Sequence, residues 1–201
     1  AELRRRKKRP DKPLAVMARD LDSVLGVCRY ERESVELLST PNAPIVIMEM
    51  RPELRTGAGS SWVKISPDSP TLGVMLPYSP LHVLLFEQLE DDPVPPFSML
   101  VMTSGNRGGE PICISNAEAL ERLSGIADLY LAHDRDINLR NDDSICAIQL
   151  GGAQVWRRAR GYAPEPVRVS RPLRRSVLAM GAGMKNAVAL GGGHEIVLSP
   201  H

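Results

Sequence analysis

Small polar side chains and glycines follow an apolar run at residues 101–109, VMTSGNRGG. A strand that ends in hydroxyl groups, an amide and glycines can direct Ser104, Asn106 and several backbone N–H groups at one bound anion. The spacing matches neither the GxxxxGK[ST] phosphate loop nor the GxGxxG dinucleotide motif. Because turns of this composition are abundant, a purely structural turn is the first interpretation of this segment taken alone.

A basic run, RKKRPDKP at residues 6–13, precedes the first apolar segment of the chain. Arginine grips a phosphate through two parallel hydrogen bonds and lysine acts as a point charge, so this run suits a triphosphate or a pyrophosphate. Short basic runs are also typical of nuclear-localisation and nucleic-acid-binding segments. The run therefore predicts an anionic ligand without identifying it.

Two further segments concentrate charge. Residues 133–144, HDRDINLRNDDS, include Asp142 and Asp143, which could hold Mg²⁺ beside phosphates, could orient arginines, or could belong to a salt-bridge cluster in a loop. Residues 156–164 are WRRARGYAP, and on a strand Arg158 and Arg160 would share one face and form an anion clamp. The alternative for this second segment is an exposed basic strand edge that discourages aggregation.

Other catalytic signatures are missing from the sequence. It contains no HExxH motif, no Cys/His spacing of a zinc site and no GxSxG elbow. His82 falls in an apolar helical pattern and is interpreted as a packed or capping histidine, and nothing in the sequence indicates an activated thiolate at Cys113.

The charge is strongly partitioned, although the 201 residues carry a formal net charge of only +1. Residues 1–13 hold seven basic and two acidic side chains (+5), residues 14–156 hold ten and twenty (−10), and residues 157–175 hold seven and one (+6). If the fold brings the two basic blocks together, they form a concentrated anion site; otherwise they are a solvated tail and a solvated linker.

Composition excludes several classes of protein. With 43% hydrophobic and 24% charged residues the chain is not a disordered tail, and with 4% aromatics it is a poor stacking platform for single-stranded nucleic acid. It has no apolar run near the ~20 residues of a membrane helix and no opening signal peptide. The three cysteines lie far apart, so we expect a reduced protein in the cytoplasm, away from membranes.

Alternating strands and helices must position these residues. The pattern predicts strands over residues 14–17, 45–48, 72–76 and 97–102, a hairpin over 144–158, and short strands over 177–180, 187–190 and 195–198. It predicts helices over 20–39, from Ser79 to Leu89 and from Ser115 to Gly125, and a loop over 51–70. We therefore expect an α/β (α+β) layered domain over residues 1–168, a proline-rich linker over 169–176, and the start of a second domain over 177–201.

Five segments, in this order, resemble the hydrogenase maturation carbamoyltransferase family (HypF). They are RRRKKRPDKPLAVM, LGVMLPYSPLH, LVMTSGNRGGEPI, LAHDRDINLRNDDSI and RRARGYAPEPV, which are similar to the YrdC-like domain of that family. GAGMKNAVAL and the final LSPH resemble the opening of its next domain, of the ASKHA type. The resemblance implies a YrdC-like twisted mixed sheet with flanking helices, followed by the first strands of an ASKHA-type domain. It also implies that the acylphosphatase and zinc-binding domains and a first YrdC-like strand lie outside this sequence, which we expect to be incomplete for the full reaction.

The resemblance implies an ATP-dependent carbamoyltransferase. Such enzymes make carbamoyl-adenylate and pyrophosphate from ATP, with Mg²⁺ expected, and a carbamate derived from carbamoyl phosphate; the carbamoyl group then passes to the C-terminal cysteine of HypE for cyanide-ligand synthesis. Phosphate binding is implied for Lys7, Arg9 and Lys12, adenylate binding for Ser104 and Asn106, and closure of the site for Arg158 and Arg160. The alternatives are an antibiotic O-carbamoyltransferase, a YrdC-type threonylcarbamoyl-adenylate synthase and an RNA-binding module.

Overall fold

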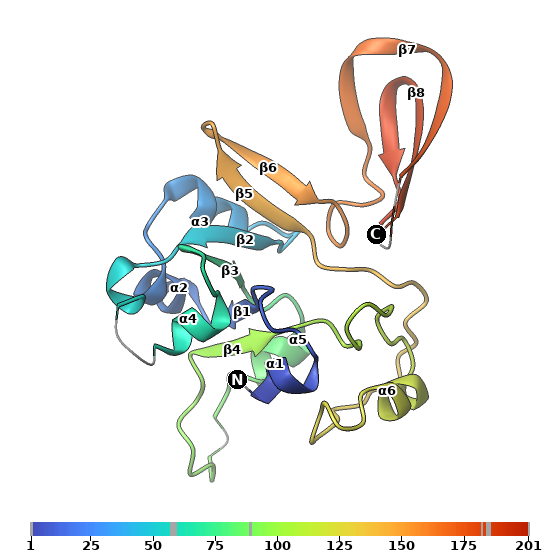
Figure 1. The fold of residues 1–201 in the computed structure, drawn as a ribbon. Helices are drawn as coiled ribbons and strands as arrows, with labels where there is room; N and C mark the ends of the chain where they lie inside the picture. The colour runs from blue at the N-terminus through green and yellow to red at the C-terminus, as the bar shows by residue number, and fades with distance from the viewer. Residues whose placement is uncertain (1, 57–59, 89, 182, 184–185, 201) are drawn as a thin grey trace. The chain divides into compact units, whose positions relative to one another are not determined.

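The computed structural model describes residues 2–56, 60–88, 90–181, 183 and 186–200 (Figure 1). The chain divides into two compact units, each discontinuous in sequence. Unit 1 comprises Ala1–Pro10, Ser104–Ser144 and Arg157–His201, and unit 2 comprises Asp11–Thr103 and Ile145–Trp156.

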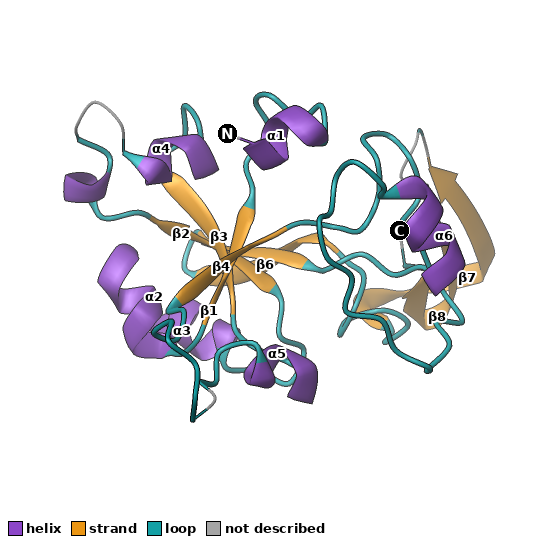
Figure 2. Ribbon diagram, turned by 90° about the horizontal axis from the view of Figure 1, so that it is seen from below, coloured by secondary structure: helices purple, strands orange, loops and turns teal. Residues whose placement is uncertain are grey.

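A six-stranded sheet forms the centre of unit 2. Its strands, in chain order, are β1 (Ala15–Ala18), β2 (Ile45–Glu49), β3 (Thr71–Met75), β4 (Met99–Met102), β5 (Ile145–Gln149) and β6 (Gly152–Arg157), and their order in the sheet is β4-β1-β3-β2-β5-β6. β1 is parallel to β3 and antiparallel to β4, whereas β2 is parallel to β5 and antiparallel to β3. The predicted twisted mixed sheet with flanking helices is therefore confirmed, and Figure 2 shows the strands fanning around one another.

The strands β1, β2 and β3 are covered on both faces of the sheet, to which their alternate residues point. On one face Val16 and Val74 join a cluster that also includes Val24 and Leu38 from the helices after β1. On the other face Met17 and Met75 pack with Ile45 and with Phe86, which follows helix α5 (Pro80–Leu84). The apolar runs over residues 14–17, 45–48 and 72–76 thus form the core of unit 2, whereas the edge strands β4 and β6 are mostly half-buried or exposed.

The helix predicted over residues 20–39 is in fact two helices, α2 (Leu21–Val27) and α3 (Arg32–Leu38). Between them Cys28 pairs with Met50 as an isolated antiparallel bridge, and the Arg29 N–H donates to the Glu49 carbonyl at 2.9 Å. These backbone contacts to the end of β2 interrupt the helix, and nothing in the local periodicity indicates them.

Two other local predictions, the loop over residues 51–70 and the helix that begins at Ser79, have different outcomes. The loop predicted over residues 51–70 contains the short helices η1 (Pro52–Leu54) and α4 (Ser61–Ile65), so that prediction was wrong there. The start of α5 is confirmed, because the Ser79 hydroxyl accepts a hydrogen bond from the His82 N–H at 3.3 Å, but the helix ends at Leu84. The His82 ring lies edge-on to Tyr78 at 4.4 Å between centroids, which is the packed role expected for it.

Unit 1 contains α1 (Glu2–Arg6), α6 (Asn116–Arg122) and the antiparallel strands β7 (Val167–Gly181) and β8 (Ala187–Leu198). The predicted cap of α6 is confirmed, since the Ser115 hydroxyl accepts from the Glu118 N–H at 3.1 Å. Residues 169–176, predicted as a linker, lie within β7, and the three short strands predicted after it are the end of β7 and one long β8. The division into domains at these residues stays a prediction. Among the described residues, no helix has the length and hydropathy of a membrane span.

Candidate anion-binding site

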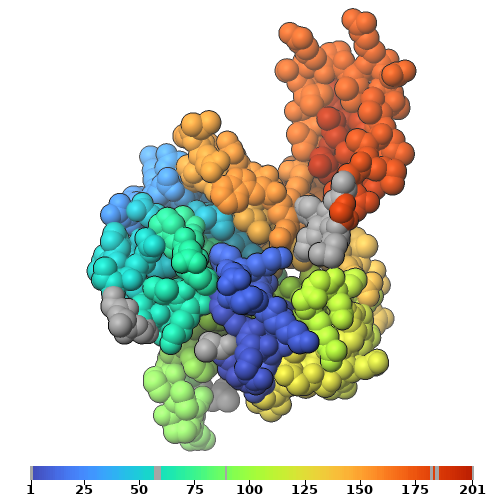
Figure 3. Space-filling view, viewed as in Figure 1, coloured from blue at the N-terminus to red at the C-terminus, as the bar shows by residue number. Residues whose placement is uncertain are grey.

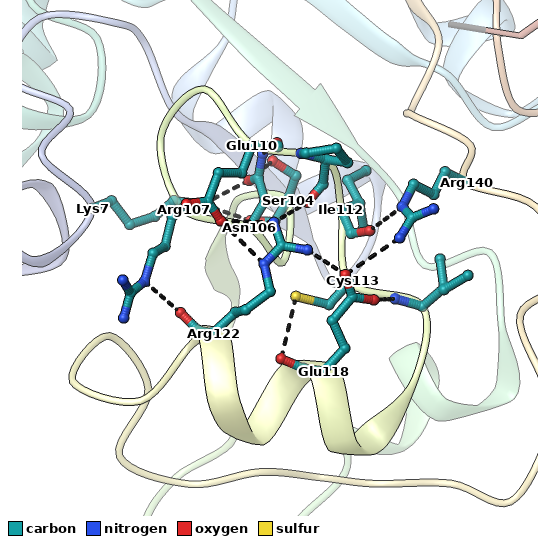
Figure 4. A network of polar contacts seen from close by, with 12 residues as sticks. Lys7, Ser104, Asn106, Arg107, Glu110, Ile112, Cys113, Glu118, Arg122 and Arg140 are labelled. Atoms are coloured by element: carbon teal, nitrogen blue, oxygen red, sulfur yellow. Dashed lines mark hydrogen bonds and ion pairs between the residues drawn. The ribbon is translucent and has the colours of Figure 1, made fainter.

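Lys7 lies directly after α1 and is buried, with 4% of its surface exposed. Its Nζ donates to the Ser104 carbonyl at 2.5 Å and lies 3.4 Å from the Asn106 Oδ1 (Figure 4). In the space-filling view the blue N-terminal segment lies at the surface beside the lime-green segment after β4 (Figure 3). A Cβ at Gly108 would lie 3.3 Å from the Lys7 carbonyl oxygen, so glycine at 108 allows this close approach of the two backbones.

Ser104 and Asn106 form the other half of this contact. The Ser104 hydroxyl donates to the Asn106 Oδ1 at 2.7 Å, and the Asn106 N–H donates to the Ser104 carbonyl at 2.9 Å. The Asn106 Nδ2 donates to the Glu110 carbonyl at 2.6 Å, which fixes the orientation of the side-chain amide. The structure therefore brings together three of the predicted site residues, two of them on the loop after β4 and one from the N-terminal basic run.

The two basic blocks of the sequence also meet within unit 1. Burial, and secondarily the positive charge of Arg9, lower the pKa of Lys7 from its usual value. Burial lowers the pKa of Arg9 as well, and the neighbouring charges of Arg4 and Arg157 add to this effect. Arg157 belongs to the second basic block, so cations from the two blocks repel one another at Arg9, whose charge in turn acts on Lys7. An anion bound among them would relieve this repulsion.

The lowered pKa of Lys7 predicts a pH dependence of stability. Between that lowered pKa and the ordinary lysine value of 10.5, the unfolded chain binds more protons than the folded one at this residue, so the free energy of unfolding rises with pH. We expect the wild type to gain stability relative to Lys7→Met as pH increases through this window. Urea unfolding of both proteins at several pH values up to 10.5 measures the difference, and a difference that shrinks with rising pH would contradict the prediction.

The remaining predicted site residues have separate partners. β6 ends at Arg157, so the strand alternation expected for Arg158 and Arg160 does not apply. The Arg158 Nη2 donates to the Glu165 carbonyl at 2.7 Å, with the guanidinium 5.7 Å from the centroid of the Tyr162 ring. The Arg160 Nε contacts the Asp143 Oδ1 at 3.0 Å. The fold therefore does not place Arg158 and Arg160 on one strand face as a shared clamp.

Asp142, Asp143 and Lys12 complete the predicted set. The Asp142 carbonyl accepts from the Arg160 N–H at 3.0 Å, and the ion pair with Arg160 gives Asp143 the arginine-orienting role that was one of its alternatives. Within the part of the chain that is described, no three His, Cys, Asp or Glu side chains form a group that could hold a metal ion. Lys12 is exposed on the segment of unit 2 that leads into β1.

Sequence reasoning missed an ionic network beside the loop after β4 (Figure 4). Arg122 at the end of α6 contacts both Glu110 and Glu118, and Arg140 also contacts Glu118 at 3.3 Å. The spacing of four residues between Glu118 and Arg122 on a helix is a signal that could have indicated the central pair. The contacts to Glu110 and Arg140 link segments far apart in sequence, and no local pattern indicates them.

Comparisons with known proteins identify the family of the chain. The family model named for Sua5, YciO and YrdC, described as telomere recombination, matches residues 1–159. The carbamoyltransferase HypF of Synechocystis sp. is 42% identical over 200 residues, which are 100% of this chain and 24% of the relative. The chain therefore spans about a quarter of the length of that curated relative.

Comparison with solved structures gives the same families. Full-length HypF in its phosphate- and nucleotide-bound form superposes with a TM-score of 0.84 at 44% identity, covering 100% of this chain and 30% of that one. Sua5 of P. abyssi, solved with L-threonine, superposes with a TM-score of 0.60 at 15% identity over 78% of this chain and 43% of that one, which shows the fold alone. The chain belongs to the Sua5–YciO–YrdC family, and over its whole length it is similar to a segment of the HypF carbamoyltransferases.

Proposed function

We propose that this chain is the nucleotide-binding module of a HypF-type carbamoyltransferase, and that it forms carbamoyl-adenylate from ATP and a carbamate derived from carbamoyl phosphate. The observation that carries the proposal is the burial of Lys7 against Ser104 and Asn106 with further cations beside it. The similarity to HypF in a phosphate- and nucleotide-bound form supports the same ligand class. Identity to Sua5 is far lower than to HypF, which favours carbamate over a threonine-derived substrate.

The reaction requires charge neutralisation more than acid–base catalysis. A carbamate oxygen attacks the α-phosphorus of ATP; an O–P bond forms, the bond from the α-phosphorus to its bridging oxygen breaks, and pyrophosphate leaves. No proton has to be moved. Lys7, Arg9 and Arg157 would oppose the negative charge of the phosphates, and Ser104 and Asn106 would hold the adenylate.

Magnesium fits this proposal as part of the substrate. Mg²⁺ commonly keeps several waters and binds through substrate phosphates with one or two carboxylates. The described residues hold no three-residue metal cluster, and the Asp143 carboxylate already contacts Arg160. We therefore assign Mg²⁺ to the ATP phosphates and the two aspartates to the support of Arg160.

We also propose a protein acceptor for the carbamoyl group. We infer that the carbamoyl group is passed on to the C-terminal cysteine of HypE, for cyanide-ligand synthesis in hydrogenase maturation. The three free cysteines of this chain are all buried and unbridged, which is compatible with the reducing cytoplasm that we assign to the protein.

Pyrophosphate exchange into ATP tests the proposed reaction. The longest natural polypeptide that contains these residues is incubated with ATP, Mg²⁺ and labelled pyrophosphate, with ammonium carbamate in one arm and threonine plus bicarbonate in the other. We expect exchange in the carbamate arm alone. Exchange confined to the threonine arm would instead identify a threonylcarbamoyl-adenylate synthase.

A binding measurement addresses the RNA alternative. We expect calorimetry with the 201-residue chain to show saturable ATP binding at ~150 mM salt and no comparable affinity for a short RNA duplex. An RNA affinity that exceeds the ATP affinity and falls steeply with salt would identify a nucleic-acid-binding module.

A further inference from the structure

The loop that carries Ser104 and Asn106 continues irregularly to the start of α6. Within it the N–H groups of Asn106, Glu110 and Cys113 donate to the carbonyls of Ser104, Arg107 and Gly105 respectively. These three backbone hydrogen bonds fix only part of residues 104–114, so the conformation of this segment depends largely on side-chain contacts. Those contacts come largely from one face of α6.

Arg122 makes the densest of these contacts. Its Nε and Nη2 donate to the Glu110 Oε2 at 3.1 and 2.7 Å, and its Nη2 also donates to the Pro111 carbonyl at 2.9 Å. Its Nη1 contacts the Glu118 carboxylate one helical turn earlier. The side chains of Arg122 and Glu118 are each only 22% exposed, so this cation is shielded from water between two carboxylates.

A further contact with α6 comes from an arginine of the loop itself. The Arg107 Nε donates to the Arg122 carbonyl at 2.7 Å, at the end of α6 where helical carbonyls lack partners. Arg122 therefore holds the loop at Glu110 and Pro111 through its side chain and at Arg107 through its backbone. Both ends of the turn over residues 107–111 are tied to a single residue.

This anchoring reaches the candidate site through Glu110. The Glu110 carbonyl accepts the hydrogen bond from the Asn106 Nδ2, while the Glu110 carboxylate is held by Arg122. The Asn106 Oδ1 in turn faces the Ser104 hydroxyl and the Lys7 ammonium. Moving Glu110 would thus turn the amide that Lys7 and Ser104 contact, although the hydrogen bonds of the Arg122 side chain go to Glu110, Pro111 and Glu118.

We propose that Arg122 is a positioning residue: by fixing Glu110 it fixes the amide of Asn106 and so sets the affinity of this site for ATP. The assignment rests on the proposed function, because it names a residue that prepares the same nucleotide site. Arg122 acts on Asn106 through Glu110 and is not itself assigned to ATP binding.

A double-mutant cycle tests the assignment. Calorimetry should show ATP affinity about tenfold weaker in Arg122→Ala, which corresponds to the loss of one modest contact. In the Asn106→Ala background the same change should have no further effect, since the amide through which it acts is gone. Arg122→Lys, which keeps the charge but loses the forked geometry, should give an intermediate affinity. Equal losses in both backgrounds, or no loss in either, would overturn the assignment.

The control and a ligand-free measurement separate this proposal from the proposed function. Arg32→Ala removes an arginine from another helical pair spaced by four residues, with Glu36 in α3, and should leave ATP affinity unchanged. In ¹⁵N spectra recorded without nucleotide, the side-chain amide signal of Asn106 should shift in Arg122→Ala and stay in place in Arg32→Ala. A wild type that does not bind ATP refutes the proposed function, whereas an unshifted Asn106 signal refutes the role of Arg122 on its own.

Discussion

Replacing Lys7 and Arg9 together by alanine is expected to reduce ATP affinity at least about 100-fold and to abolish carbamate-dependent pyrophosphate exchange. Hydrogen bonds to charged groups contribute about 1.5–3 kcal/mol each, and two such losses at the lower value amount to about 100-fold in affinity. Lys7 is buried beside Ser104 and Asn106, and its pKa is lowered by burial and by Arg9, so both cations lack much of the water that would otherwise screen them. A phosphate bound there would interact with cations that water screens only weakly.

The chain offers a closely matched control for this double variant. Lys8 belongs to the same basic run and Arg5 directly precedes that run; both are exposed, and Arg5 contacts Glu2 on the surface of α1. Arg5→Ala with Lys8→Ala removes the same charge and should change ATP affinity by less than threefold at physiological salt, because screened surface charges act weakly at a distance. Equal losses in the two double variants would mean that the net charge of the run matters and that Lys7 and Arg9 have no specific role.

Local sequence signals predicted the elements whose causes are local. The hydroxyl caps at Ser79 and Ser115 start helices as expected, and the apolar runs at 14–17, 45–48 and 72–76 lie in the three central strands. Each of these elements depends on residues that are close together in the sequence. A helix cap satisfies an N–H three residues away, and a short apolar run forms a strand that can be buried on both faces of a sheet.

The features that sequence missed depend on distant partners. The break between α2 and α3 follows from Cys28 meeting Met50, and the ionic network follows from Arg122 meeting Glu110. The partition of charge did indicate that two basic blocks could combine, and Arg157 of the second block lies close enough to Arg9 of the first to lower its pKa. It could not indicate that Lys7, and not its neighbour Lys8, points inward, because that choice is set by the end of α1 and by the loop at Ser104.

Ser144 is the buried residue on which the geometry around Arg160 depends. Its hydroxyl is fully buried; it donates to the Arg160 carbonyl at 2.8 Å and accepts from the Ala159 N–H at 2.9 Å. Asp143, which precedes Ser144 in the sequence, pairs with Arg160 as an isolated parallel bridge. One buried hydroxyl therefore joins the Ala159 N–H to the Arg160 carbonyl and aligns the segment in which Asp143 meets Arg160.

We expect Ser144→Ala to lower the free energy of unfolding by about 1–3 kcal/mol, because it leaves the buried Ala159 N–H and the part-buried Arg160 carbonyl without the hydroxyl that joins them. Ser39→Ala is the matched control: its exposed hydroxyl donates to the Val35 carbonyl at the end of α3, and its loss should change stability by no more than about 0.5 kcal/mol. Urea unfolding of the three proteins measures both values. If Arg160 contributes to the nucleotide site, ATP affinity measured below the unfolding transition should also fall in Ser144→Ala, while it stays constant in Ser39→Ala. Equal stability of the two variants would show that the Ala159 and Arg160 backbone groups find other partners, and that the hydroxyl does not hold this segment.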